Sequence, residues 1–156
     1  MLQFVYDNDT IIAEFIAHML GRELRSFGRY KTLGVLDADG RLIGGIVYHN
    51  YDKAAGVIEV GVAAVDRRFF NRATFRRLFE YVFIGAECQM LFSRVRASNE
   101  HLLSQLARLN FNLTLIPRLY GRDEDGVIAT LTDDQWLDSK LARRVYRDAT
   151  GREEAA

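Results

Sequence analysis

The sequence has few of the residues that mark cross-linked or metal-binding proteins. Cys88 is the only cysteine in the 156 residues, so no disulfide can form within the chain. The three histidines are scattered and do not stand with cysteine at zinc-ligand spacing, so we expect no metal site. We therefore expect a reducing, cytoplasmic location.

Long apolar runs are also missing. No stretch of about 18 consecutive apolar residues is present, so we expect no transmembrane helix and no membrane partner. The first ten residues, MLQFVYDNDT, lack the basic region and the apolar region of a secretory signal, so we expect no such signal.

The chain has no excess charge of either sign. Lys and Arg together number 21, as do Asp and Glu, which gives a formal net charge of +0. This balance disfavours nucleic acid as a partner, because a basic field over the whole surface is absent and any attraction for anions must be local. The arginines do gather locally, above all in residues 67–77, RRFFNRATFRR, which contain no acidic residue.

Apolar periodicity predicts one α/β domain. Runs rich in β-branched residues between 31 and 65 are separated by the turn sequences DADG and YDKAAG, which predicts three antiparallel strands. Amphipathic spacing predicts a helix over about 70–86 and another that begins at SNEH. With strands expected at 2–6 and 89–97, a helix after DNDT, a hairpin over 111–132 and a final helix, the expected order is β-α-(α)-β-β-β-α-β-α-β-β-α.

The C-terminal part follows this domain. We expect a single domain over residues 1–132 and a C-terminal helix with a frayed tail over 133–156. Pro117, the sole proline, lies in a strand candidate, which predicts an edge strand or a bulge because proline cannot donate to a strand ladder.

The stretch RRFFNRATFRR stands where an apolar strand, GVIEVGVAAV, leads into a helix. The first N–H groups of a helix have no partner within it and form an anion site, and neighbouring arginines add charge-assisted hydrogen bonds. The sequence thus predicts a site for a diphosphate. The alternative is a solvated basic face whose arginine stems cover the phenylalanine rings.

This junction resembles the diphosphate loop of the GNAT superfamily of acyl-CoA-dependent N-acyltransferases. The family pattern there is Gln/Arg-x-x-Gly-x-Gly/Ala, and RFFNRA places Arg68, Asn71 and Ala73 on it. Asn71 stands in the place of the usual glycine. Because asparagine tolerates a left-handed backbone, we expect the loop to form.

A second motif has the family's spacing. Asn99 opens NEHLLSQLARLNF, where many members have Asn and, about a dozen residues later, Gly-Phe. Asn110 replaces that glycine, and Leu106 stands where the family often has a tyrosine that protonates the leaving thiolate. The closing hairpin over 111–132 resembles that of bacterial and phage members, so the resemblance covers roughly residues 1–132.

The resemblance implies a mixed, mostly antiparallel sheet of six to seven strands with helices on both faces. It also implies that the fourth strand separates from the fifth and binds the pantetheine of acetyl-CoA along its free edge. The cofactor-binding residues that we expect on this basis are Val62, Ala63, Ala64, Val65, Arg67, Arg68, Phe70, Asn71, Arg72, Ala73, Thr74 and Asn99.

Glu59 is the expected catalytic residue. It interrupts an almost wholly apolar strand, and a buried carboxylate would have a raised pKa that suits a general base. Several GNAT enzymes have a glutamate near this point, so the resemblance implies the same role. The alternative is a glutamate on the solvent face, because alternation separates Glu59, Gly61 and Ala63 from Val60, Val62 and Ala64.

These observations predict an N-acetyltransferase that uses acetyl-CoA as co-substrate and acts on the primary amine of a small molecule or a protein. We expect a monomer or a homodimer. Because Asn71 and Asn110 replace glycines and Leu106 replaces a tyrosine, the alternative is a catalytically inactive GNAT-fold protein with a partner-binding or structural role in a bacterium or phage. A small nucleic-acid-binding module with phosphate contacts from the arginines is a third hypothesis.

Overall fold

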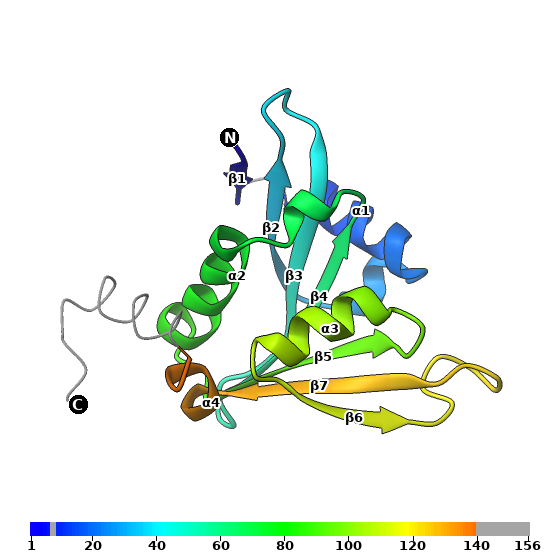
Figure 1. The fold of residues 1–156 in the computed structure, drawn as a ribbon. Coiled ribbons are helices and arrows are strands. Elements are labelled where there is room, and N and C mark those ends of the chain that lie inside the picture. The colour runs from blue at the N-terminus through cyan, green and yellow to red at the C-terminus, as the bar shows by residue number, and fades with distance from the viewer. Residues whose placement is uncertain (7–8, 140–156) are drawn as a thin grey trace.

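A computed structural model describes residues 1–6 and 9–139. Its strands form one seven-stranded sheet in the order β1-β2-β3-β4-β5-β7-β6 (Figure 1). The strands are β1 Gln3–Val5, β2 Tyr30–Leu36, β3 Leu42–Asp52, β4 Val57–Ala64, β5 Met90–Arg96, β6 Asn112–Ile116 and β7 Gly126–Thr132. All neighbouring pairs are antiparallel except β4 and β5, so the predicted fold class is confirmed.

Helices cover both faces of the sheet (Figure 1). One face carries α1 Asp9–Leu20, whose Ile12 and Ile16 pack with Val47 and Ala63. The other face carries α2 Arg72–Phe79 and α3 Glu100–Arg108, whose apolar residues share one core with β4 and β5. The short helices are η1 Leu24–Phe27, η2 Arg67–Phe69, η3 Glu80–Gly85 and α4 Asp133–Leu137.

Helix α2 does not continue as a regular helix to residue 86, as its apolar spacing predicts. It begins at Arg72 and changes at Glu80 into the π-helical segment η3. The backbone N–H of Ala86 bonds the carbonyl of Tyr81 at 2.8 Å, five residues back, which is the π-helical pattern. The wider turn lies beside the pocket described below.

The connection from β4 to α2 is packed tightly onto the sheet. Phe69 of η2 is fully buried, and its ring lies over Gly44 of β3. A Cβ atom at Gly44 would lie 2.3 Å from this ring, so the position requires glycine. The contact fixes the path of the chain from β4 to the start of α2.

The end of the described chain agrees with the sequence analysis where it can be compared. β6 ends directly before Pro117 and is the edge strand of the sheet. Trp136 of α4 is buried and stacks on Phe83, with ring centroids 4.9 Å apart, so it anchors α4 to the core. The predicted continuation of this helix and the tail, residues 140–156, lie outside the described residues. Among the described residues, no helix is long and apolar enough to span a membrane.

Candidate functional site

The sheet opens between β4 and β5. These parallel strands pair only over Val57–Glu59 and Met90–Phe92, and the register ends there although both strands continue. Residues 60–64 of β4 therefore have no partner on β5. The predicted separation of the fourth strand from the fifth is confirmed.

Four residues of the expected cofactor site follow one another along this free part of the chain. Ala63 is buried on the face of α1, while Val62 and Ala64 are partly buried against the core under α2. Val65, which follows the strand, is 60% exposed. The alternation that the sequence predicts is therefore confirmed, and the free stretch is lined by small side chains.

Two helices begin beside the opening. β4 leads through η2 to α2, and β5 leads to α3, so both helix N-termini lie at the edge where the parallel strands end. A ring contact joins them, since Phe70 before α2 lies 4.9 Å from His101 in the first turn of α3. Asn99 caps α3, and its Oδ1 accepts the N–H of Leu102 at 3.3 Å.

Asn71 does not take the left-handed backbone that the glycine pattern predicts. Its φ is −136°, and it is the N-cap of α2, where its Oδ1 accepts the N–H of Thr74 at 3.0 Å. The expectation of a left-handed residue here is wrong because an asparagine can satisfy the helix end with its side chain, as glycine cannot. Asn110, at the end of α3, has a φ of 73° and does adopt the left-handed conformation.

The N-terminal turn of α2 retains two donors. The backbone N–H groups of Arg72 and Ala73 have no hydrogen-bond partner among the described residues. Thr74 offers nothing to a ligand here, because its N–H bonds Asn71 and its side chain is fully buried. Of the expected residues in this turn, Arg72 and Ala73 thus remain exposed at the helix end.

The arginines of residues 67–77 divide between ion pairs and solvent. Arg68 donates to Asp66 through Nη2 at 2.8 Å and lies 3.6 Å from Asp37, so its charge is already compensated. Arg67 and Arg72 are exposed and make no ion pair within the described part of the chain. The remaining two have structural partners, namely Glu80 for Arg76 and, for Arg77, the hydroxyl of Tyr6 and the ring of Phe4.

Glu59 lies at the apex of the opening, as the last residue of β4 that pairs with β5. It is 4% exposed, so it is not a surface glutamate. Arg94 Nε donates to its Oε2 at 3.1 Å, and Asn50 Nδ2 donates to its Oε1 at 2.8 Å. Asn50 reaches the carboxylate from a bulge in β3, where its φ is 49°.

Two more cationic or titratable groups face the same carboxylate. Arg22, in the connection after α1, has Nη1 at 3.8 Å from Oε2 of Glu59, and His49 has Nε2 at 3.4 Å from the same oxygen. Burial of the Glu59 carboxyl raises its pKa, but the contacts of His49, Asn50 and Arg94 outweigh burial and lower it to about 2. The expectation of a raised pKa is therefore wrong, since the sequence does not show which partners a buried carboxylate has.

The expected site residues do not include five members of this cluster: Arg22, His49, Asn50, Arg94 and Tyr120. Arg94 and Arg96 alternate with apolar residues on β5, a pattern that places both on one face and could have indicated them. Tyr120, in the connection from β6 to β7, has a pKa raised by burial and interacts electrostatically with Arg94, Arg96, Arg22 and Glu59. For Arg22 and Tyr120 the sequence carries no comparable signal.

The family's usual proton donor is absent at its expected position. Leu106 of α3 is 5% exposed and packs in the core, so no titratable group stands there.

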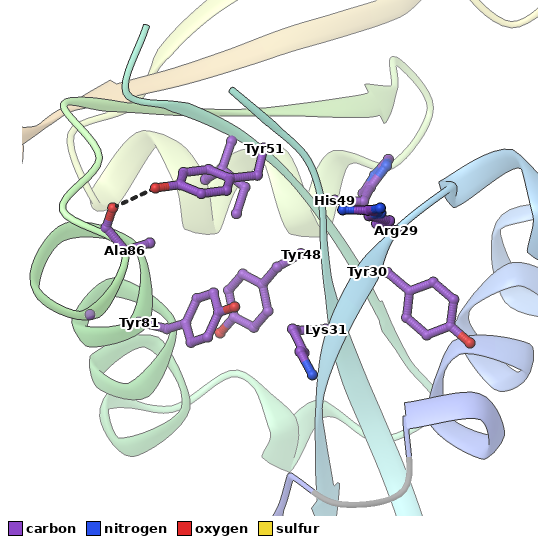
Figure 2. Close-up of a pocket in the computed structure, with 10 residues that line it drawn as sticks. Arg29, Tyr30, Lys31, Tyr48, His49, Tyr51, Tyr81 and Ala86 are labelled. Atoms are coloured by element: carbon purple, nitrogen blue, oxygen red, sulfur yellow. Dashed lines mark hydrogen bonds between the residues drawn. The ribbon is translucent and has the colours of Figure 1, made fainter. Parts of the chain in front are cut away.

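A separate pocket of about 560 Å³ lies on the opposite face of the sheet. Figure 2 shows Tyr48, Lys31 and Tyr81 on one side of β2 and β3, while the ring of Tyr30 points to the other side. The rings of Tyr48 and Tyr81 lie 4.1 Å apart, and Tyr51 donates to the carbonyl of Ala86. His49 of β3 belongs to both regions, because it lines the pocket and also lies 3.4 Å from Glu59.

Comparison with known proteins identifies the fold of this chain. No protein-family model matches the sequence, and no curated protein matches it. Among solved structures, a mutant form of the spermidine/spermine N-acetyltransferase SpeG from Vibrio cholerae has a TM-score of 0.69 and 15% sequence identity, over 88% of this chain and 98% of that chain.

Two further structures from the same organism give the same result. A mutant spermidine N-acetyltransferase SpeG has a TM-score of 0.70 at 14% identity, over 88% of this chain and 96% of that chain. A dodecameric spermidine N-acetyltransferase in an intermediate state has a TM-score of 0.69 at 14% identity, over the same shares of the two chains. The chain therefore has the fold of the GNAT superfamily, as its motifs imply.

Proposed function

We propose that the chain is an N-acyltransferase that transfers an acyl group, specifically acetyl, from coenzyme A to a primary amine. The separation of β4 from β5 beyond Glu59 carries this proposal. It leaves a strand edge that leads to two helix N-termini, an arrangement suited to an extended ligand that ends in a diphosphate. The matched structures, which are N-acetyltransferases, support the same reaction class.

The residues present fit an acyl-CoA. The backbone of Val62–Val65 would hold the pantetheine arm as an added strand, and the small side chains of Ala63 and Ala64 leave space beside it. The diphosphate would meet the free N–H groups of Arg72 and Ala73 and the uncompensated side chains of Arg67 and Arg72. Arg68 supports the turn through Asp66, Phe70 joins the two helix starts through its ring contact with His101, and Asn99 caps α3.

In the proposed reaction a neutral amine nitrogen attacks the thioester carbonyl carbon. A C–N bond forms, the C–S bond breaks, coenzyme A leaves as the thiolate, and one amine proton must be removed. The thiolate needs no acid to leave, since a thiol has a pKa of about 8.5.

The role of Glu59 as the base stays a prediction. A pKa of about 2 makes the carboxylate a weak proton acceptor while Arg94 and His49 lie beside it. The variant Glu59→Gln tests this role directly.

The test is release of free coenzyme A thiol from acetyl-CoA in the presence of a panel of primary amines, with mass detection of the acetylated amine. The proposal predicts amine-dependent thiol release that Glu59→Gln reduces by about 100-fold or more, the usual range for a general base. Glu14→Gln, a change of an exposed glutamate on α1, is the matched control. Absence of amine-dependent release from every amine would reject the proposal.

A second candidate function is a non-catalytic binding protein on the same fold. Asn71 favours it, because its side chain occupies the Thr74 N–H that a diphosphate could otherwise use. The buried Leu106, where a proton donor is often found, favours it too. Acetyl-CoA that binds without acyl transfer to any amine would support this candidate.

A further inference from the structure

The accessible charges at the apex of the opening are positive. The side chain of Glu59 is only 5% exposed, whereas those of Arg22 and Arg94 are 22% and 38% exposed. A molecule that approaches this apex on the α1 face therefore meets guanidinium groups before it meets the carboxylate.

These guanidinium groups are held in place but not saturated. Arg94 bonds Glu59 through Nε, and its two Nη groups have no hydrogen-bond partner in the described ranges. Arg22 is oriented by Ser26, whose Oγ accepts its Nε at 3.1 Å, and by the ring of Phe27 under its guanidinium. Arginines fixed in this way match a carboxylate, which accepts two parallel N–H groups.

The local charge is not balanced. Arg22, Arg94 and Arg96 stand against Glu59 and Glu124, and Glu124 is taken by Arg96 at 2.7 Å, so one positive charge remains. Burial, followed by repulsion from Arg94, lowers the pKa of Arg22. One added negative charge would relieve this repulsion.

Tyr120 completes the surface. Its ring lies under the guanidinium of Arg96, 4.5 Å from the centroid, and its hydroxyl interacts electrostatically with Arg94 and Arg22 as well. Burial raises the pKa of Tyr120, so the hydroxyl keeps its proton and remains a donor. An anion at this point would thus find a neutral donor beside the arginines.

We infer that the acceptor is a small amine that also carries a carboxylate, an amino-acid-like molecule whose carboxylate binds Arg22 and Arg94 beside Tyr120. This inference rests on the proposed acyl transfer and names its acceptor class. It separates this chain from the polyamine acetyltransferases that share its fold, since a polyamine would bring further positive charge to an already positive apex.

The experiment compares free L-amino acids with the matching L-amino acid amides, together with putrescine and spermidine. Each pair differs only in the carboxylate, and rates are corrected for the neutral fraction of each amine. The inference predicts that kcat/KM for the best acid exceeds that for its amide by about tenfold or more, the range of a charge-assisted pair. Arg94→Gln and Arg22→Gln should raise KM for the acid and bring the ratio toward one.

Two further variants distinguish loss of carboxylate binding from a general disturbance of the structure. Arg94→Lys keeps the charge and should retain part of the preference for the acid. Arg25→Gln removes an exposed arginine that pairs with Glu23 outside the cluster, and the ratio should remain that of the wild type.

The outcomes separate this inference from the proposed function. Amides or polyamines acetylated as fast as the acids would overturn the inference and leave the acyltransferase intact. If calorimetry shows bound acetyl-CoA but no acid is acetylated, the inference is also overturned. If acetyl-CoA does not bind and no amine reacts, the proposed function fails and the inference fails with it.

Discussion

Arg94 of β5 donates a hydrogen bond to Glu59 of β4 at the point where these two strands cease to pair. This side-chain hydrogen bond links β4 and β5 at the apex of the opening, beyond which the two strands have no backbone pairing. The pKa of Glu59, the proposed base, therefore depends in part on Arg94 of the neighbouring strand.

Arg94→Gln should lower the free energy of unfolding by about 1–2 kcal/mol, because it removes a charge-assisted hydrogen bond from a buried carboxylate. Urea unfolding at neutral pH measures the change, and Arg25→Gln, which alters an exposed pair, should be close to wild type. Equal midpoints for the wild type and Arg94→Gln would mean that the contact contributes nothing to stability.

The pH dependence of stability should carry the signature of Glu59. Its pKa in the folded chain is about 2, below the value of about 4.3 for an unfolded chain. The group therefore contributes stability that is complete above about pH 5 and is lost as the pH falls toward 2. The wild type should lose up to about 3 kcal/mol more than Glu59→Gln over this interval. Parallel profiles for the two proteins in acid unfolding would contradict the lowered pKa.

Asn71 offers a test of the anion site at the start of α2. Asn71→Asp keeps an N-cap acceptor for Thr74 but adds a negative charge where the diphosphate would lie. We expect thermal stability close to wild type and acetyl-CoA affinity lowered by about tenfold, equivalent to about 1.4 kcal/mol. Asn71→Gly, which frees the Thr74 N–H, should bind at least as tightly as wild type. Unchanged affinity in Asn71→Asp would place the diphosphate elsewhere.

Gly44→Ala should lower the stability of the protein by disturbing the packing of the connection between β4 and α2. The added Cβ would lie 2.3 Å from the buried ring of Phe69, so we expect a loss of about 2–3 kcal/mol from overpacking. Gly85→Ala is the control, since its Cβ would meet only a carbonyl oxygen at 3.7 Å. Thermal unfolding that does not separate the two variants would show that Phe69 is free to move.

The sequence predicts the fold well because each element has a local signal. Residues 31–65 alternate apolar strands with Asp and Gly turns, and the helices carry apolar stripes, so both types of element follow from periodicity. The π-helical segment after Phe79 was not predicted, because its aromatic spacing is compatible with a regular helix.

The candidate site was harder to predict, because its properties depend on contacts between distant segments. Glu59 was predicted as the catalytic base, yet His49, Asn50 and Arg94 come from other parts of the chain and reverse the direction of its pKa shift. Arg68 fits the diphosphate motif, but its pairing with Asp66 appears only in three dimensions.

Acetyl-CoA binding to the opening between β4 and β5 is tested most directly by calorimetry on the wild type, Arg68→Ala and the double variant Arg67→Ala/Arg72→Ala. The account predicts one site in the wild type, affinity lowered by about tenfold or more in the double variant, and a much smaller loss in Arg68→Ala, whose charge Asp66 already compensates. No heat of binding at about 1 mM acetyl-CoA, a concentration that would reveal even weak binding, would contradict the account.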